Sequence, residues 1–132
     1  MIKSILTLGA VAVAGIVIVI SILYFGISIV MANNDVGKKV FIMKCVSCHS
    51  LTQNRVGPSL GNIFDKKAGS AEEFKYSKAM KNSDIIWNYY TLDNFLKSPR
   101  EYILGTRMMF DGIKKDSNRE ALIIYLQENQ IK

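Results

Sequence analysis

The chain has 132 residues, of which 49% are hydrophobic and 21% charged, and its formal net charge is +6. This length accommodates one small domain, and the hydrophobic fraction is high for a water-soluble one. The basic residues are scattered along the chain without a nucleic-acid-binding motif, so the positive charge does not indicate a nucleic-acid-binding protein.

The hydrophobic excess comes from one segment near the N-terminus. Ile5 to Ala32 are 28 residues without a charge. As a helix they extend about 42 Å, whereas the hydrocarbon core of a bilayer is about 30 Å thick. A cleaved signal peptide is the alternative, but its apolar region spans only about 7 to 15 residues. We therefore predict an uncleaved, single-pass transmembrane anchor over residues 1–34 and a separate domain over residues 35–132.

The first part of this domain is predicted to be helical and then irregular. Asn34 or Asp35 can cap a helix from about Val36 to His49, with Met43 as part of the core. Residues 50–75 contain glycines, a proline and few periodic apolar positions, which is typical of irregular chain.

Two short helices are expected next. The first begins near Tyr76 and has one or two turns. Thr91 is expected to cap the second, which must stop near Ser98 because Pro99 follows it.

The last helix is the best marked. Ser117 and Glu120 form a capping box, and an apolar stripe follows as far as about Asn129. No segment of the domain has a strand pattern, which predicts an all-α fold. Short helices and long loops make a thin hydrophobic core, so a large bound cofactor is expected to supply further buried surface.

The sequence "CVSCH" contains both cysteines and the only histidine, as Cys45, Cys48 and His49. Two thiols separated by two residues at a helix end can each add to a vinyl group of one haem, and the next imidazole can bind its iron. A thioredoxin-like pair needs a βαβ context, and a zinc site needs further ligands. A disulfide across so short a loop would stabilise the fold poorly. The motif therefore predicts one covalently attached haem c.

The sixth ligand of the iron would have to come from elsewhere in the chain. A second imidazole is excluded because no other histidine exists. Met43 shares a helix with the attachment motif, and Met80 lies in a helical stretch. The sequence "LGTRMMF" places Met108 and Met109 in a glycine-containing loop, and spacing alone does not choose between them.

These motifs resemble, in order and spacing over residues 36–128, a class I cytochrome c of the mitochondrial and alphaproteobacterial type. The resemblance implies an all-α class I cytochrome c fold, in which the first and last helices cross at Gly37 and Tyr125. The matching segments are "GKKVFIMKCVSCH", "GPSLGNIF", "IIW", "SPREYILGTRMMFDGIKK" and "REALIIYL".

The resemblance also implies a set of haem contacts. It places the two iron ligands at His49 and Met108, with the Pro58 carbonyl accepting the proton on the other imidazole nitrogen. It places Tyr76 and Trp87 at a haem propionate.

Thr106 matches a threonine that hydrogen-bonds near the buried propionate. Phe95 and Leu104 are among the positions that depart from the family pattern. Phe95 stands where a tyrosine is usual, and Leu104 replaces a proline in the ligand loop, so this loop is expected to be less rigid.

By resemblance, the protein is an electron carrier rather than an enzyme. It would take electrons from quinol:cytochrome c oxidoreductase and pass them to a haem-copper terminal oxidase. A haem-based sensor or peroxidase-like module with a displaceable sixth ligand is the alternative. The residues expected to surround the haem edge and to dock acidic partners are Lys39, Lys44, Arg55, Arg100 and Arg107.

The expected location is the inner membrane, with the haem domain on the periplasmic side. Counting positive charges alone predicts the opposite orientation, because Lys38, Lys39 and Lys44 follow the apolar segment and only Lys3 precedes it. The resemblance implies extracytoplasmic haem attachment, and we give that argument more weight.

Overall fold

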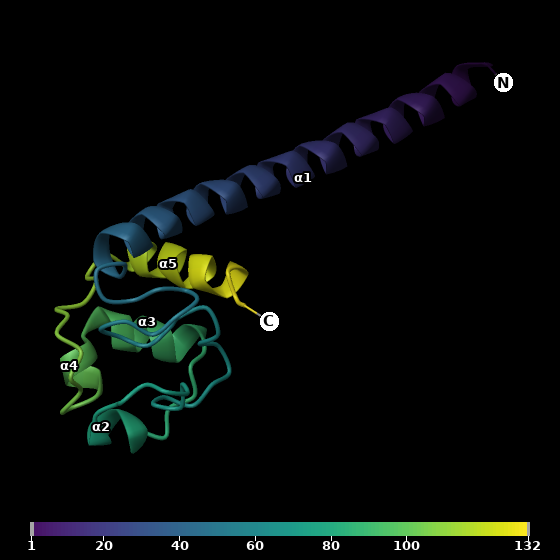
Figure 1. Ribbon diagram of the computed structural model, residues 1–132. Helices are drawn as coiled ribbons and strands as arrows, with labels where there is room; N and C mark the ends of the chain where they lie inside the picture. Colours follow the sequence, from purple (N-terminus) through teal and green to yellow (C-terminus); the bar gives the residue numbers. More distant parts are fainter. Residues whose placement is uncertain (1, 132) are drawn as a thin grey trace. The chain divides into compact units, whose positions relative to one another are not determined.

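The computed structural model describes residues 2–131, without the side chains of residues 2–14 and 28–33. Its helices are α1 (Ile2–Lys44), α2 (Lys78–Lys81), α3 (Tyr89–Lys97), α4 (Pro99–Tyr102) and α5 (Asp116–Glu128), as Figure 1 shows. Within residues 2–131, β pairing is limited to an isolated bridge between Lys67 and Ile86. The predicted all-α architecture is therefore confirmed for this part of the chain.

The chain divides into two compact units, Met1–Ala32 and Asn33–Lys132, and each is described by itself. Helix α1 contains residues 2–32 of the first unit and residues 33–44 of the second. The predicted helix start at Asn34 or Asp35 is therefore wrong. The residues before Asn34 are helical as well, and they contain no proline that would end the helix.

The predicted transmembrane segment falls largely on residues 2–14 and 28–33, whose side chains lie outside the description. Among the residues that were described in full, no helix is both long enough and apolar enough to cross a membrane.

Helix α5 forms the centre of the second unit. Its Leu122 and Ile123 are fully buried, and residues of α1 and α3 join the same core. α5 contacts α3, which in turn contacts α4, and Figure 1 shows α5 and α3 side by side. The other core residues from these helices are Val40, Phe41, Leu92, Phe95, Leu96, Tyr125 and Leu126.

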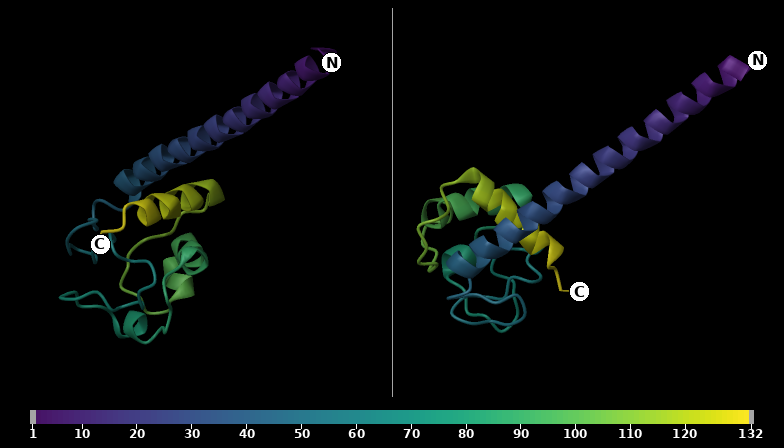
Figure 2. Two further views of the ribbon diagram at one scale, coloured as in Figure 1. Left: turned by 90° about the vertical axis from the view of Figure 1, so that its right-hand side faces the viewer. Right: turned by 90° about the horizontal axis from the view of Figure 1, so that it is seen from above.

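The C-terminal turns of α1 cross α5 at Gly37, as the right-hand view of Figure 2 shows. A Cβ atom on Gly37 would lie 2.1 Å from the Ala121 carbonyl oxygen and 2.6 Å from Cβ of Tyr125. One turn further along, the rings of Phe41 and Tyr125 have centroids 5.5 Å apart. The predicted contact between Gly37 and Tyr125 is confirmed, and it requires a residue without a side chain.

Helix α3 begins earlier than predicted. Its N-cap is Asn88, whose Oδ1 accepts from the backbone N–H of Thr91 at 3.0 Å. The Thr91 hydroxyl accepts from the backbone N–H of Asn88 at 2.8 Å, which makes Thr91 the third helical residue. The expected stop before Pro99 is confirmed, because α3 ends at Lys97.

The capping box predicted at Ser117 and Glu120 is wrong, because α5 begins at Asp116 without a side-chain cap. Arg119 explains this start. Its guanidinium is 3% exposed and bonds to Asp93 of α3 at 2.7 Å, to Asp116 at 2.9 Å and to the Ile113 carbonyl at 2.9 Å. These bonds fix the first turn of α5 against α3 and leave the hydroxyl of Ser117 no role as a cap.

Candidate functional site

The attachment motif forms a tight turn directly after α1. The backbone N–H of Cys48 donates to the Cys45 carbonyl at 3.0 Å, and that of His49 donates to the same carbonyl at 2.8 Å. Cys45 is buried, Cys48 is half-buried, and neither forms a disulfide. Both thiols and the imidazole therefore project from one turn of backbone.

The imidazole of His49 is held through one ring nitrogen. Its Nδ1 lies 2.7 Å from the Pro58 carbonyl oxygen, so Nδ1–H donates and Nε2 carries the free lone pair. Burial lowers the pKa of His49, and the hydrogen bond to Pro58 opposes this in part. None of the residues described accepts from or donates to Nε2, so a neutral imidazole presents this atom to a metal.

Gly57 lies directly against this ring. A Cβ atom there would be 2.6 Å from Nδ1 of His49 and 2.2 Å from Cε1. The N–H of Gly57 donates to the Cys48 carbonyl at 2.8 Å, which ties the loop to the attachment turn. The sequence analysis gave Gly57 no role, although its place before Pro58 was the available signal.

The cysteines do not have the properties of a redox pair. Burial, and to a lesser extent the neighbouring Cys48, raises the pKa of Cys45 to about 11. Catalytic C-x-x-C motifs instead lower the pKa of one thiol to generate the reactive thiolate. A raised thiol pKa is the opposite of what thioredoxin-like chemistry needs, whereas it is compatible with haem attachment.

The loop from Ile103 to Ile113 separates the two candidate methionines. Met108 is half-buried and packs against the core, whereas Met109 is 84% exposed. The N–H of Met108 lies 3.3 Å from the Thr106 hydroxyl, which accepts from it. Of the two methionines, Met108 is therefore the one whose side chain packs against the interior.

The other two methionines contribute in different ways. Met80 is buried and belongs to the core. Met43 is 61% exposed, so its predicted place in the core is wrong. The reason is helical geometry, since the buried face of α1 carries Gly37, Val40 and Phe41, and Met43 projects from the other side.

Tyr76 and Trp87 are positioned as donors. Burial raises the pKa of Tyr76, and a hydrogen bond from the Ala71 backbone to the phenol oxygen partly offsets this. Trp87 is 6% exposed and its ring centroid lies 5.0 Å from that of Phe95. Within residues 2–131, neither the phenol proton of Tyr76 nor the indole N–H of Trp87 has an acceptor, so both can donate to a carboxylate.

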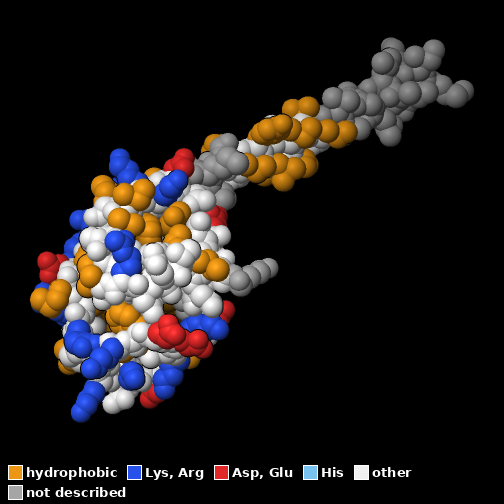
Figure 3. All heavy atoms as spheres, in the orientation of Figure 1, with side chains coloured by type: hydrophobic (Ala, Val, Ile, Leu, Met, Phe, Trp, Pro, Cys, Tyr) orange, Lys and Arg blue, Asp and Glu red, His pale blue; other side chains and the backbone are white. Residues whose placement is uncertain are grey.

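The five cations predicted to dock partners differ in their contacts. Lys39 and Lys44 are exposed and make no ion pair with any described residue. Arg55 donates to the Val46 carbonyl at 3.0 Å, Arg100 pairs with Asp111 at 2.8 Å, and Arg107 donates to the Lys75 carbonyl. Figure 3 shows basic side chains spread over the visible face of this unit rather than gathered in one patch.

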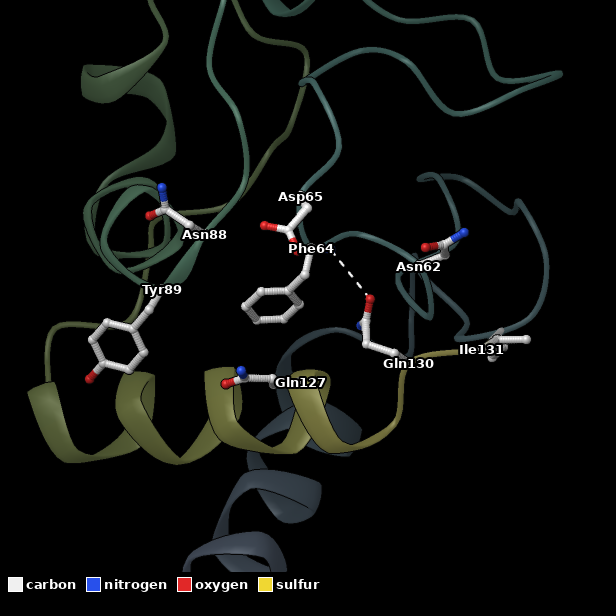
Figure 4. Close-up of a pocket in the computed structure, with 8 residues that line it drawn as sticks. All are labelled: Asn62, Phe64, Asp65, Asn88, Tyr89, Gln127, Gln130 and Ile131. Carbon is white, nitrogen blue, oxygen red and sulfur yellow. Dashed lines mark hydrogen bonds between the residues drawn. The ribbon is translucent and has the colours of Figure 1, made fainter.

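A separate pocket of about 560 Å³ is lined by four carboxamide side chains, one carboxylate, Phe64, Tyr89 and Ile131. Figure 4 shows Gln130 at its edge, where it accepts from the Phe64 N–H at 3.3 Å. The pocket has no thiol, imidazole or thioether in its lining, and none of the predicted site residues contributes to it. It is therefore not part of the haem site.

A C-x-x-C-H turn with a polarised imidazole, inside an all-helical unit, defines a c-type haem protein. The sequence model for cytochrome c matches residues 35–130. The chain belongs to the class I cytochrome c family, whose members are electron-transfer proteins and not enzymes.

Individual relatives agree with this assignment. Cytochrome c of Stellaria longipes is 42% identical over 96 residues, which cover 70% of this chain and 89% of the relative. Cytochrome c2 of Afifella marina is 42% identical over 97 residues, covering 69% and 77%. The solved structure of cytochrome cH from Methylobacterium extorquens is 34% identical with a TM-score of 0.69, and the match covers 71% of this chain and 96% of that one.

The residues present fit a covalently bound haem c. Cys45 and Cys48 would supply the two thioether links, and Nε2 of His49 would supply an iron ligand that the Pro58 carbonyl orients. When bound, the haem accepts and releases one electron. The surrounding protein positions the ligand, and its buried apolar side chains keep water away.

Proposed function

We propose that the protein is a membrane-anchored, one-electron carrier of a respiratory chain, with a haem iron bound by His49 and Met108. It takes electrons from quinol:cytochrome c oxidoreductase and passes them to a haem-copper terminal oxidase. The observation that carries this proposal is the contrast between half-buried Met108 and exposed Met109. A thioether directed at the interior can complete the coordination that His49 begins.

Histidine and methionine together close the coordination sphere of the iron. No position is then left for a substrate, so the centre can only exchange electrons. Methionine ligation also raises the reduction potential. A high potential suits a carrier late in a respiratory chain.

Tyr76, Trp87 and Thr106 complete the proposed haem contacts. The free donors of Tyr76 and Trp87 are suited to one propionate carboxylate, as the family resemblance implies. Thr106 acts near the buried propionate and also accepts from the Met108 backbone, which connects the propionate contact to the ligand loop.

We further propose that Lys39, Lys44, Arg55, Arg100 and Arg107 steer the domain towards acidic docking surfaces. Exposed charges of one sign raise association rates in a salt-dependent way. Lys39 and Lys44 are the strongest candidates, because the three arginines also bond within the protein.

Residues 1–34 are proposed to anchor the protein in the inner membrane, with the haem domain in the periplasm. Support comes from the 28 uncharged residues of Ile5 to Ala32, which are long enough as a helix to span a bilayer. Anchoring confines the carrier to the plane in which integral membrane oxidoreductases work.

The optical spectrum of the oxidised protein tests the ligand pair. Methionine-ligated ferric haem has a weak long-wavelength charge-transfer band, which should be present in the wild type and in Met109→Leu but absent in Met108→Leu. A high-spin spectrum with carbon monoxide binding in the wild type would instead favour the sensor or peroxidase-like function.

A further inference from the structure

The loop that carries Met108 is anchored in the core at both ends by Ile103 and Ile113, and Met108 itself packs partly against the core. Leu104 is 81% exposed and Met109 is 84% exposed, so neither side chain anchors the loop. Within the loop, the Thr106 N–H donates to the Ile103 carbonyl at 3.0 Å. At its end, the Ile113 N–H donates to the Leu96 carbonyl at 2.8 Å. Polar contacts at the surface can therefore add to the core packing that holds Met108 in place.

Two arginines provide such contacts on either side of Met108. Arg107 directly precedes it and donates to the Lys75 carbonyl. Asp111, three residues after it, accepts from Nη2 of Arg100 at 2.8 Å. Because Arg100 belongs to α4, this ion pair joins the helix before the loop to the far side of the loop.

We propose that the Arg100–Asp111 ion pair is a clamp that keeps the ligand loop closed and so positions Met108. This inference rests on the proposed role of Met108 as the iron ligand. Arg100 and Asp111 act through the loop and are positioning residues. The clamp also means that Asp111 offsets part of the charge of Arg100, so Arg100 contributes less to docking than Lys39 and Lys44 do.

The size of the effect follows from exposure. The two side chains are 54% and 91% exposed, and ion pairs with such exposure stabilise weakly and are screened by salt. Loss of the pair should therefore raise the population of the open loop by about two- to fivefold. A ligand that binds only the open form should bind tighter by the same factor.

Imidazole is a suitable probe, because it can bind the iron only after Met108 leaves. The oxidised full-length holoprotein is titrated with imidazole at low ionic strength, and binding is followed through the methionine charge-transfer band. The variants are Arg100→Gln, Asp111→Asn and the double substitution. Lys67 and Asp84 form an exposed pair at 2.6 Å outside the loop, so Asp84→Asn is the matched control.

If the clamp exists, each single substitution should tighten imidazole binding about two- to fivefold, and the double substitution should tighten it no further. High salt should remove the difference in imidazole affinity between these variants and wild type. Arg100→Lys keeps the positive charge and should tighten imidazole binding less than Arg100→Gln does. Asp84→Asn should bind imidazole as wild type does. Unchanged affinity in the single variants, or additive effects in the double variant, would overturn the clamp. A wild type without the methionine band would overturn the proposed ligand pair itself, and the clamp with it.

Discussion

A Cβ atom on Gly57 would lie 2.2 Å from Cε1 of His49, so the imidazole rests on the backbone of this glycine. Nδ1, which is bonded to Cε1, donates to the Pro58 carbonyl at 2.7 Å. Two consecutive residues therefore set the position and the tautomer of the ring. Because the two contacts are adjacent, a small displacement of this loop must change both.

Gly57→Ala is accordingly expected to displace the imidazole. The added methyl group cannot fit at 2.2 Å without moving the ring or the loop, and overpacking of this kind costs about 1–3 kcal/mol. We expect a lower yield of haem-loaded protein and a larger high-spin fraction in its oxidised spectrum. Gly15→Ala is the control, since its Cβ has nothing within 4 Å. A Gly57→Ala spectrum identical to that of wild type would contradict the contact.

Arg119 supports a second prediction, on stability. Its guanidinium is 3% exposed, and the hydrogen bond that it donates to the Asp93 carboxylate raises the pKa of Arg119. Asp93→Asn removes the main countercharge of a buried cation and should lower the free energy of unfolding by about 1–3 kcal/mol. Asp116→Asn should cost about 0.5 kcal/mol or less, because the Asp116 side chain is 87% exposed.

Denaturant unfolding of the haem-loaded protein, followed by Trp87 fluorescence, measures both costs. Trp87 suits this purpose because it is the only tryptophan and is 6% exposed in the fold. Equal costs for the two aspartates would mean that Asp93 is not the dominant partner of Arg119.

Tyr76 gives a prediction on pH dependence. Burial raises the pKa of its phenol above the ordinary value, and a propionate that accepts the phenol proton would raise it further. A raised pKa in the fold favours the neutral form. The stabilisation from Tyr76 is therefore fully present below the unfolded pKa of about 10 and is lost as the pH rises through the folded pKa.

An alkaline titration of tyrosinate absorbance, compared between wild type and Tyr76→Phe, isolates this group. The absorbance change that is present in wild type and absent from Tyr76→Phe belongs to Tyr76. It should titrate above pH 10 in the folded protein and at about the ordinary value of 10 in denaturant. A folded component that titrates at or below the denatured one would show that the phenol is not held in its neutral form.

Local patterns in the sequence predicted several of these features. The C-x-x-C-H motif and the stop before Pro99 could be predicted from neighbouring residues. The close approach at Gly37 followed from the family resemblance. Thr91 was assigned to the wrong cap position because Asn88, three residues earlier, caps equally well and completes a reciprocal pair. Sequence alone does not fix the register of such a pair.

Other features depend on pairs that only the folded chain brings together. Asp93 and Arg119 are 26 residues apart, and the start of α5 follows from their contact rather than from Ser117. Asp111 and Arg100 are 11 residues apart on either side of Met108, too far apart in the sequence for a helical i, i+3 or i, i+4 pair. Exposed charges carry no periodic signal, so the sequence predicted Arg100 as a docking residue and did not predict its partner.

The proposed anchor makes the final prediction. Full-length protein should stay with the membranes after washing in high salt or alkaline carbonate, because a spanning helix is held by apolar burial rather than by charge. Replacing residues 1–34 with a cleavable signal peptide should preserve export and release the haem-loaded domain in soluble form.

Ile18 offers a test within the intact chain, since it lies in the middle of the uncharged segment. Ile18→Lys places a charge at mid-membrane depth at a cost of about 2.5–3.5 kcal/mol and should reduce the membrane-retained fraction. Ile18→Leu keeps the residue apolar and should behave as wild type. Haem absorbance in the pellet and supernatant after the wash measures each variant. If high salt alone released the wild type, the protein would be held at the membrane surface by charge, and the spanning anchor would be wrong.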